Sequence, residues 1–398
     1  MQNKNSNFIA RFLFITIFIS LLNSCLKAHI QEKEILPAAS QPEEYLLLLK
    51  DKKVGLVVNQ TSLVNDSMHL VDILIENGIS VDKIFSPEHG FRGEAADGTL
   101  IENSKDGKTG IPIVSLYGTN RKPNPESFQD LDVIIFDIQD VGARFYTYIS
   151  TMHYVMQTCA QVNIPLIIFD RPNPNGYYVD GPVLQPEYQS FVGLDPIPVV
   201  HGMTVGELAQ MINGEGWLAD SLVCDLNVIK VKNYNHASRY SLPVKPSPNL
   251  PNDKAINLYP SICFFEGTQM SLGRGTGFPF QVLGYPDSTF GNFQFTPVSI
   301  PGVSDHPPLE GKLCYGIDLR QEPELNRISL KYLIEFYQKW HGEKPFFREY
   351  INQLAGNSDL KKQIESGMSE EEIRKTWQAD LVEFKKKRKK YLLYQDFE

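Results

Sequence analysis

Apolar strands alternate with helices through the first half of the chain, and this alternation constrains the fold more than any other feature. The strand-like runs are largely apolar and end in polar residues; they cover 54–62, 81–90, 112–118, 132–140, 165–176 and 226–234. Segments with helical periodicity separate them at 69–78, 145–163 and 201–216. Strands that are buried on both faces and separated by helices predict a parallel sheet with helices on each side.

The second half of the chain has a different composition. Residues 241–311 are rich in proline, glycine and aromatic side chains, and 245–253 (KPSPNLPND) has the composition of a linker. Helical periodicity returns at 329–340 and 369–394. The change predicts a second domain after the parallel sheet, and a chain of 398 residues is long enough for two domains.

The N-terminus has the character of an export signal. An apolar run at 12–22 follows a short basic segment and is too short to span a bilayer easily as a mature helix. The sequence LNSC at 22–25 resembles the bacterial lipoprotein signal, in which the cysteine is lipidated; a plain signal peptide with an incidental cysteine is the alternative. We predict a signal peptide over 1–24, lipidation of Cys25, a tether over 25–43 and a location at the membrane of the bacterial envelope, in the periplasm or the outer membrane.

Charge and cysteine content exclude several classes of protein. The net charge is −9 at pH 7, whereas a nucleic-acid-binding surface is usually basic, so we predict no nucleic-acid partner. The basic run Lys385–Lys390 follows the acidic Glu370–Glu372 in one predicted helix, an order that complements the helix dipole and predicts a solvated surface. No CxxC pair is present, and the later cysteines lie in apolar runs, which predicts buried free thiols at Cys159, Cys224, Cys263 and Cys314.

Polar residues follow nearly every predicted strand. Ligands of an open parallel sheet bind beyond the carboxyl ends of its strands, so these residues predict a cleft. They include Glu88, His89, Arg92, Tyr117, Asp137, Asp140, Arg144, Asp170, Arg171 and His201. The first strand is not followed by GxGxxG, and the sequence contains no GxxxxGK[ST], GxSxG or HExxH motif, so we predict no cofactor and no metal.

These side chains allow two kinds of chemistry. In one, Glu88 is the general acid for cleavage of a glycosidic bond, and Asp137, Asp140 or Glu266 is the second carboxylate. In the other, acidic and histidine side chains form an oxygen and nitrogen metal site, although no spacing matches a ligand signature; these are His89, Asp137, Asp140, Asp170 and His201. A structural role is the alternative for single residues, since Asp170 with Arg171, or Asp137 with Arg144, could form ion pairs that fix loops.

Longer motifs carry a resemblance to a known family. In order along the chain they are SPEHGFRG (86–93), SLYG (115–118), DIQDVGARFYTYISTM (137–152), DRPNPNG (170–176), HGMTVGELA (201–209) and FEGTQMSLGRGTGFPFQ (265–281). Together they resemble the exo-β-N-acetylmuramidase NamZ family, from about residue 45 to the YLLY at 391–394. The resemblance implies an α/β fold with a Rossmann-like parallel-sheet domain over 44–247, a smaller α/β (α+β) C-terminal domain over 248–398 that completes the cleft, and an active site between them.

The same resemblance implies an activity and roles for residues. The expected reaction is the release of N-acetylmuramic acid from the non-reducing end of peptidoglycan fragments. By position Glu88 is the expected catalytic acid, which His89 and Asp140 would orient or charge-balance. The lactyl carboxylate of this sugar calls for an arginine fork, for which the motifs offer Arg92, Arg144, Arg171 and Arg274. Further substrate contacts are expected from Tyr117, Asp137, Tyr146, Asp170, His201 and Glu266.

Two other functions remain open at this point. One is a metal-dependent hydrolase, such as a deacetylase, that acts on cell-wall sugars. The other is a surface lipoprotein that binds glycans without cleaving them. The expected partners in every case are cell-wall saccharides containing N-acetylmuramic acid and N-acetylglucosamine, together with a membrane that holds the N-terminal lipid.

Overall fold

The computed structural model describes residues 33–65, 67–87, 91, 104–118 and 120–398. Residues 36–398 form one compact unit. The predicted signal peptide, Cys25 and most of the tether lie outside the described residues, as do Glu88, His89 and Arg92.

A seven-stranded sheet is the centre of the first half of the described chain. Its strand order is β3-β4-β2-β1-β5-β6-β9, and every neighbouring pair is parallel except β3 with β4. The strands are β1 (Lys53–Val58), β2 (Ser80–Ser86), β3 (Ser104–Lys105), β4 (Pro112–Ser115), β5 (Val133–Asp137), β6 (Leu166–Phe169) and β9 (Leu226–Ile229). The predicted parallel sheet is therefore confirmed, and the chain order reverses between β1 and β5, where such sheets bind ligands.

Helices cover both faces of this sheet, as the sequence predicts. On one face, alternate residues of β1, β5 and β6 pack with α2 (Pro42–Leu49) and α3 (Leu70–Glu76). On the other face, the intervening residues of these strands pack with α4 (Tyr148–Val162) and α5 (Val205–Gly214). Burial of both faces explains why these strands are almost continuously apolar in sequence.

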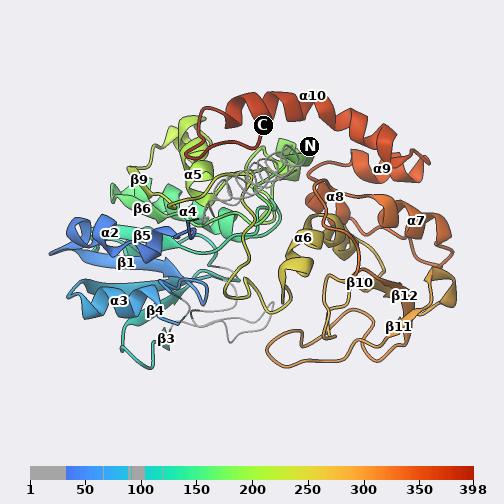
Figure 1. The fold of residues 1–398 in the computed structure, drawn as a ribbon, viewed down its shortest axis with the longest axis horizontal. Coiled ribbons are helices and arrows are strands. Elements are labelled where there is room, and N and C mark those ends of the chain that lie inside the picture. The colour runs from blue at the N-terminus through green and yellow to red at the C-terminus, as the bar shows by residue number, and fades with distance from the viewer. Residues whose placement is uncertain (1–32, 66, 88–90, 92–103, 119) are drawn as a thin grey trace, which may run out of the picture. The chain divides into compact units, whose positions relative to one another are not determined.

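The second half of the chain is built around a small antiparallel sheet. In the described residues its order is β10-β12-β11, made by β10 (Val282–Tyr285), β11 (Phe293–Phe295) and β12 (Cys314–Asp318). The helices of this half are α6 (Asp253–Ile262), α7 (Lys331–Lys339), α8 (Tyr350–Ala355), α9 (Asp359–Glu365) and α10 (Glu370–Arg388). A two-stranded ribbon of β7 (Asp180–Val183) and β8 (Pro198–Val200) precedes α5. Figure 1 shows the two sheets well apart in the view, with α10 running from α9 back toward α5.

The start of α4 differs from the sequence prediction, which placed it at residue 145. The helix begins at Tyr148, because the preceding residues form a turn in which the Arg144 amide donates to the Val199 carbonyl at 2.8 Å. This turn needs Gly142, whose φ is +76° and whose added Cβ would lie 2.1 Å from Oδ1 of Asn173. Because the helix begins at Tyr148, Phe145 lies in the loop before α4 and not in the helix.

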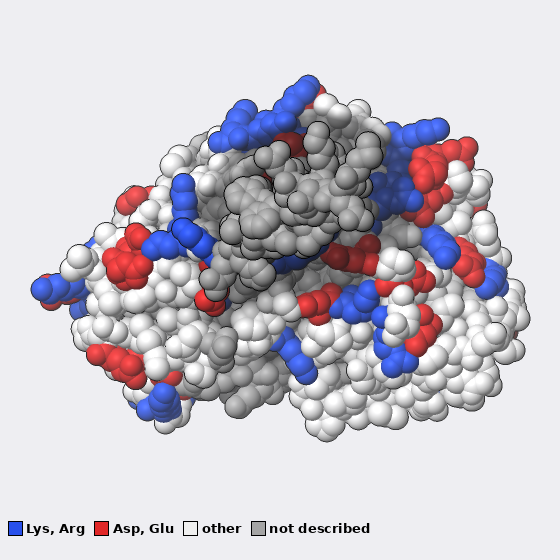
Figure 2. Space-filling view, in the orientation of Figure 1, with Lys and Arg blue, Asp and Glu red and all other residues white. Residues whose placement is uncertain are grey.

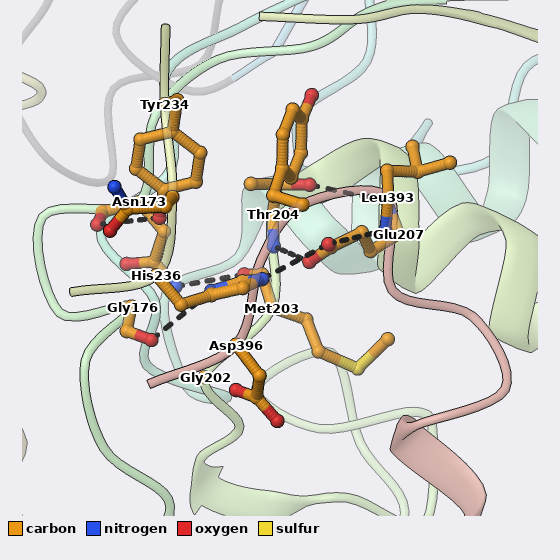
Figure 3. Close-up of polar contacts among 12 residues, drawn as sticks. Asn173, Gly176, Gly202, Met203, Thr204, Glu207, Tyr234, His236, Leu393 and Asp396 are labelled. Atoms are coloured by element: carbon orange, nitrogen blue, oxygen red, sulfur yellow. Dashed lines mark hydrogen bonds and ion pairs between the residues drawn. The ribbon is translucent and has the colours of Figure 1, made fainter. Parts of the chain in front are cut away.

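The chain after α10 returns to the N-terminal half and pairs with α5. The amide of Leu393 donates to Oε1 of Glu207 at 2.8 Å, and the Nε2 atom of His236 lies 3.0 Å from the same oxygen (Figure 3). Glu207 also closes the predicted capping box of α5 with Thr204, which is confirmed. Both Glu207 and His236 are fully buried, so this polar cluster is shielded from water and fixes the returning chain on α5.

Two surface predictions have different outcomes. The four cysteines Cys159, Cys224, Cys263 and Cys314 are buried free thiols, as predicted. The prediction that the whole run Lys385–Lys390 is solvated is wrong for Arg388, which is fully buried. Its guanidinium donates twice to the Gly202 carbonyl, at 2.7 and 3.0 Å, and pairs with Asp396 at 2.8 Å, so carbonyl and carboxylate oxygens replace water around the charge.

Elsewhere the surface carries mixed charge. On the face shown in Figure 2, acidic and basic side chains are interspersed. Among the described residues, no helix combines the length and the apolar character that crossing a membrane requires.

Replacement of Arg388 by alanine is expected to destabilise the fold, because it leaves the Asp396 carboxylate and the Gly202 carbonyl without their buried donor. The expected loss in the free energy of unfolding is about 3–5 kcal/mol, measured by denaturant titration. Lys386→Ala is the matched control from the same basic run, since that side chain is 66% exposed and pairs with Glu383 at the surface. Equal denaturation midpoints for the two variants would contradict the structural role of Arg388.

Candidate active site

A cavity of about 680 Å³ lies between the two halves of the chain. From the first half, its wall includes Tyr117 and Arg121 after β4 and residues 145–148 at the start of α4. The second half contributes residues from α6, from the loops 274–280 and 304–308, and from α8. The segment 245–253, predicted as a linker, is packed here and adds Ser247 and Leu250 to the wall. The cavity therefore opens beyond the carboxyl ends of parallel strands, where the sequence placed the cleft.

Aromatic rings form a continuous part of this wall. The ring of Tyr259 makes edge contacts with Phe145, Tyr146 and Phe280, with centroid distances of 5.2, 5.8 and 5.0 Å. All four residues line the cavity. Aromatic side chains are common in the walls of small-molecule sites, and ring faces suit the apolar faces of sugars.

Glu266 and Arg274 form an ion pair in the cavity wall. The Arg274 guanidinium donates through Nη2 at 2.6 Å and through Nε at 3.0 Å to Oε1 of Glu266. Gly275 fixes the turn that carries Arg274, because its φ is +77° and an added Cβ would lie 2.5 Å from the Val298 carbonyl oxygen. Both charged side chains keep about a fifth of their surface accessible, so a ligand can reach them.

The carboxylate of Asp137 is committed to a buried ion pair instead. Arg171 holds it in a fork, with Nε at 2.5 Å from Oδ1 and Nη2 at 2.9 Å from Oδ2. The exposed fractions of these side chains are 4% for Arg171 and 0% for Asp137, and neither lines the cavity. The structure thus pairs Asp137 with Arg171 and not with Arg144, and it joins the ends of β5 and β6.

Arg144 is fully buried and binds three carbonyl oxygens. Its Nη1 donates to Pro182 and Ile197 at 2.8 Å each, and its Nη2 donates to Leu354 at 2.9 Å. Burial lowers the pKa of the guanidinium to about 9. Arg144 does not line the cavity, and it connects the ribbon β7–β8 with α8.

Asp170 and His201 are also buried away from the cavity. Asp170 accepts hydrogen bonds from Thr204, Tyr394 and the Gly206 amide, and burial raises its pKa to about 6 against the opposing effect of these donors. Burial, and then the nearby charge of Arg388, lower the pKa of His201 to about 3, so its ring is neutral at pH 7. Asp170 and His201 therefore help to hold the chain around α5.

Asp140 is buried next to the loop that leads to the cavity. Its Oδ1 accepts the Gly142 amide at 2.7 Å, and its Oδ2 has no hydrogen-bond partner among the described residues. Burial raises the pKa of this carboxyl to about 7, with the Gly142 and Val141 amides opposing the rise. A carboxyl that titrates near neutral pH has the proton affinity of a general acid, although Asp140 itself does not line the cavity.

The predicted site residues therefore separate into three groups. Those that line the cavity are Tyr117, Tyr146, Glu266 and Arg274. Those buried in the frame behind it are Asp137, Asp140, Arg144, Asp170, Arg171 and His201. Glu88, His89 and Arg92 lie outside the described residues, so their predicted roles stay predictions.

Sequence reasoning missed several cavity residues. Arg121, Phe191, Asp305 and His306 line the cavity but lie outside the quoted motifs. The sequence did contain one signal for Arg121 as a cavity residue, which is its position three residues after the SLYG motif at 115–118. Within the described part of the chain, no group of three histidine, cysteine or acidic side chains is arranged to hold a metal ion.

Comparison with known proteins gives consistent matches over most of the chain. Residues 54–254 match the family model described as "Exo-beta-N-acetylmuramidase NamZ, N-terminal", and residues 257–394 match the corresponding C-terminal model. A protein of Bacillus subtilis (strain 168) named "Peptidoglycan beta-N-acetylmuramidase NamZ" is 39% identical over 372 residues, which are 88% of this chain and 89% of that protein.

Two crystal structures of DUF1343 family proteins from Bacteroides fragilis NCTC 9343 share the fold. The first is 49% identical with a TM-score of 0.84, and the match covers 92% of this chain and 100% of that one. The second is 28% identical with a TM-score of 0.78, and the match covers 91% and 99%. The predicted fold class is confirmed by these similarities together with the observed sheet.

The raised pKa of Asp140 predicts a loss of stability with rising pH. Its carboxyl holds a proton more tightly in the folded chain, with a pKa of about 7, than at the ordinary value of 3.8. This contribution to the free energy of unfolding is present below about pH 4 and is lost as the pH rises through about 7. Thermal denaturation between pH 4 and 8 should show a steeper decline for the wild type than for Asp140→Asn, and parallel curves would contradict the assignment.

Proposed function

The chain belongs to the exo-beta-N-acetylmuramidase NamZ family, and from that premise we propose that its cavity binds the non-reducing end of peptidoglycan fragments and releases N-acetylmuramic acid. The chain is a glycosidase that acts in peptidoglycan turnover. The observation that carries this conclusion is the match of both family domains to nearly the whole described chain, together with 39% identity to a relative named for this activity.

The cavity supports the proposal through its size and its lining. A volume of about 680 Å³ falls in the ordinary range for small-ligand sites. The rings of Phe145, Tyr146, Tyr259 and Phe280 offer stacking surfaces for sugars. Glycosidic cleavage also needs a proton donor and a second carboxylate on either side of the bond.

We assign the proton donor to Glu88 and the second carboxylate to Glu266. Of the three candidates for the second role, Asp137 is bound by Arg171, and Asp140 lies behind the wall. Glu266 lines the cavity, and its pairing with Arg274 fixes the position of its carboxylate. A carboxylate held in this way suits stabilisation of the positive charge that develops on the sugar ring in the transition state.

For localisation, we propose export and anchoring by lipid at Cys25. The apolar run at 12–22 and the sequence LNSC at 22–25 support this proposal. Fractionation of cells that express the full chain should place the wild type in the membrane and Cys25→Ala in the soluble envelope fraction. Detergent-free release of the wild type at the same yield as Cys25→Ala would reject the lipid anchor.

The activity is tested by incubating residues 26–398 with the disaccharide in which N-acetylmuramic acid is linked to N-acetylglucosamine, with and without EDTA, and identifying products by mass. The expected products are the two free sugars in both samples. Glu88→Gln and Glu266→Gln should each lower turnover by about 10²–10⁴-fold, because each removes a carboxyl that the reaction uses.

Each alternative outcome has a defined meaning. Activity lost in EDTA and restored by metal would favour a metal-dependent hydrolase, and binding without products would favour a glycan-binding lipoprotein. Glu310→Gln is the control, since this exposed carboxylate lies outside the cavity wall. Near-normal turnover in either active-site variant would reject that residue's role while leaving the reaction itself established.

A further inference from the structure

We propose that Arg121 binds the lactyl carboxylate of N-acetylmuramic acid and thereby selects this sugar over N-acetylglucosamine. The inference rests on the proposed function. It adds a specificity residue that the quoted sequence motifs do not contain.

An arginine that binds a substrate carboxylate must lie in the cavity wall and must not already be paired with another carboxylate. The described arginines in the cavity wall are Arg121 and Arg274. The guanidinium of Arg274 is already paired with Glu266. The earlier candidates Arg144 and Arg171 are buried on carbonyl oxygens and on Asp137. Of the described arginines, Arg121 is therefore the one that combines a place in the cavity wall with a guanidinium unpaired by any described carboxylate.

Aromatic rings hold the side chain of Arg121 in place. Its guanidinium carbon lies 4.5 Å from the ring centroid of Phe191, in a cation–π contact. Phe191 in turn stacks on Tyr154, with centroids 6.2 Å apart and an angle of 11° between the rings. Tyr154 lies in α4, so this stack connects Arg121 to that helix. The contact uses none of the N–H groups of Arg121.

The N–H donors of the Arg121 guanidinium are open to a ligand. The guanidinium carbon of Arg121 lies over the ring of Phe191, and its in-plane N–H groups make no hydrogen bond or ion pair with a described residue. The in-plane donors therefore stay available for a fork with a carboxylate, which is the strongest geometry for such a pair. An acidic residue of the wall, Asp305, forms no ion pair with Arg121, so it does not compete for these donors.

The proposed substrate carries a carboxylate that suits these donors. N-acetylmuramic acid differs from N-acetylglucosamine by a lactyl ether that ends in a carboxylate. A positively charged fork in a wall otherwise rich in aromatic rings gives this group a partner that N-acetylglucosamine cannot use. In fragments that keep the stem peptide, the same carboxyl is an amide and carries no charge, so Arg121 also favours fragments from which the peptide has been removed.

The test compares variants on matched substrates. Steady-state kinetics are measured for wild type, Arg121→Gln and Arg121→Lys on the free disaccharide and on the same disaccharide with its lactyl carboxyl converted to a primary amide. We expect Arg121→Gln to lower kcat/KM on the free acid by roughly 10- to 100-fold, as for a lost charge-assisted hydrogen bond, and to leave the amide nearly unchanged. Arg121→Lys should retain part of the preference, because it keeps the charge but loses the fork.

Arg320→Gln is the matched control. Arg320 is also stacked on a phenylalanine, at 4.7 Å from the centroid of Phe278, but it pairs with Asp318 and does not line the cavity. It should behave as wild type on both substrates. Thermal midpoints of all variants should agree, since Arg121 is exposed.

The outcomes separate this inference from the proposed function. If wild type cleaves neither disaccharide, the proposed function fails. If wild type cleaves the free acid but Arg121→Gln loses nothing, or loses equally on acid and amide, the assignment of Arg121 is wrong and the activity stands. A third substrate carries an L-alanyl-D-glutamate stem. A loss confined to that substrate would show that Arg121 binds peptide carboxylates, which also overturns the lactyl assignment.

Discussion

The buried guanidinium of Arg144 joins the two halves of the chain behind the cavity. It joins the carbonyls of Pro182 and Ile197 in the first half to that of Leu354 in α8. The turn that carries it continues into Phe145 and Tyr146, and α8 carries Tyr350, so walls from both halves are fixed to one side chain. Burying a cation is costly unless its donors are satisfied, and the loss of any one carbonyl partner would loosen both walls together.

A second consequence of the fold is that some polar residues bind one another at the edge of the sheet, whereas others face the cavity. Several of those that directly follow the strands bind one another: Arg171 donates to Asp137, and the hydroxyl of Thr61 accepts the backbone amide of Gln139 at 3.0 Å. They form a rigid polar layer across the carboxyl edge of the sheet. Other groups face the cavity: Arg121 lies farther along the loop after β4, and Glu266 comes from the second half. Rigid support behind exposed functional groups is what keeps a binding geometry in place.

Much of this fold could be predicted from the sequence, because periodicity and capping are local. The strand and helix pattern of the first half, the capping box of Thr204 and Glu207, and the buried thiols all depend on near neighbours in the chain. The burial of Arg388 could not be predicted, because its partner Gly202 lies 186 residues away. For the same reason, the sequence could not distinguish Asp137, which forms a buried ion pair with Arg171, from Glu266, which faces the cavity. Residue type indicated the chemistry, and only tertiary contacts decided which side chains are free to perform it.

The returning segment after α10 has a consequence for how the chain is made. The hydroxyl of Tyr394 donates to Asp170 at 2.6 Å across 224 residues of sequence, and the Leu393 amide donates to the buried Glu207. During synthesis the parallel sheet therefore emerges long before these donors exist, and its polar centre stays open to water until then. The polar centre of the first half is therefore completed only when the C-terminal segment supplies these donors.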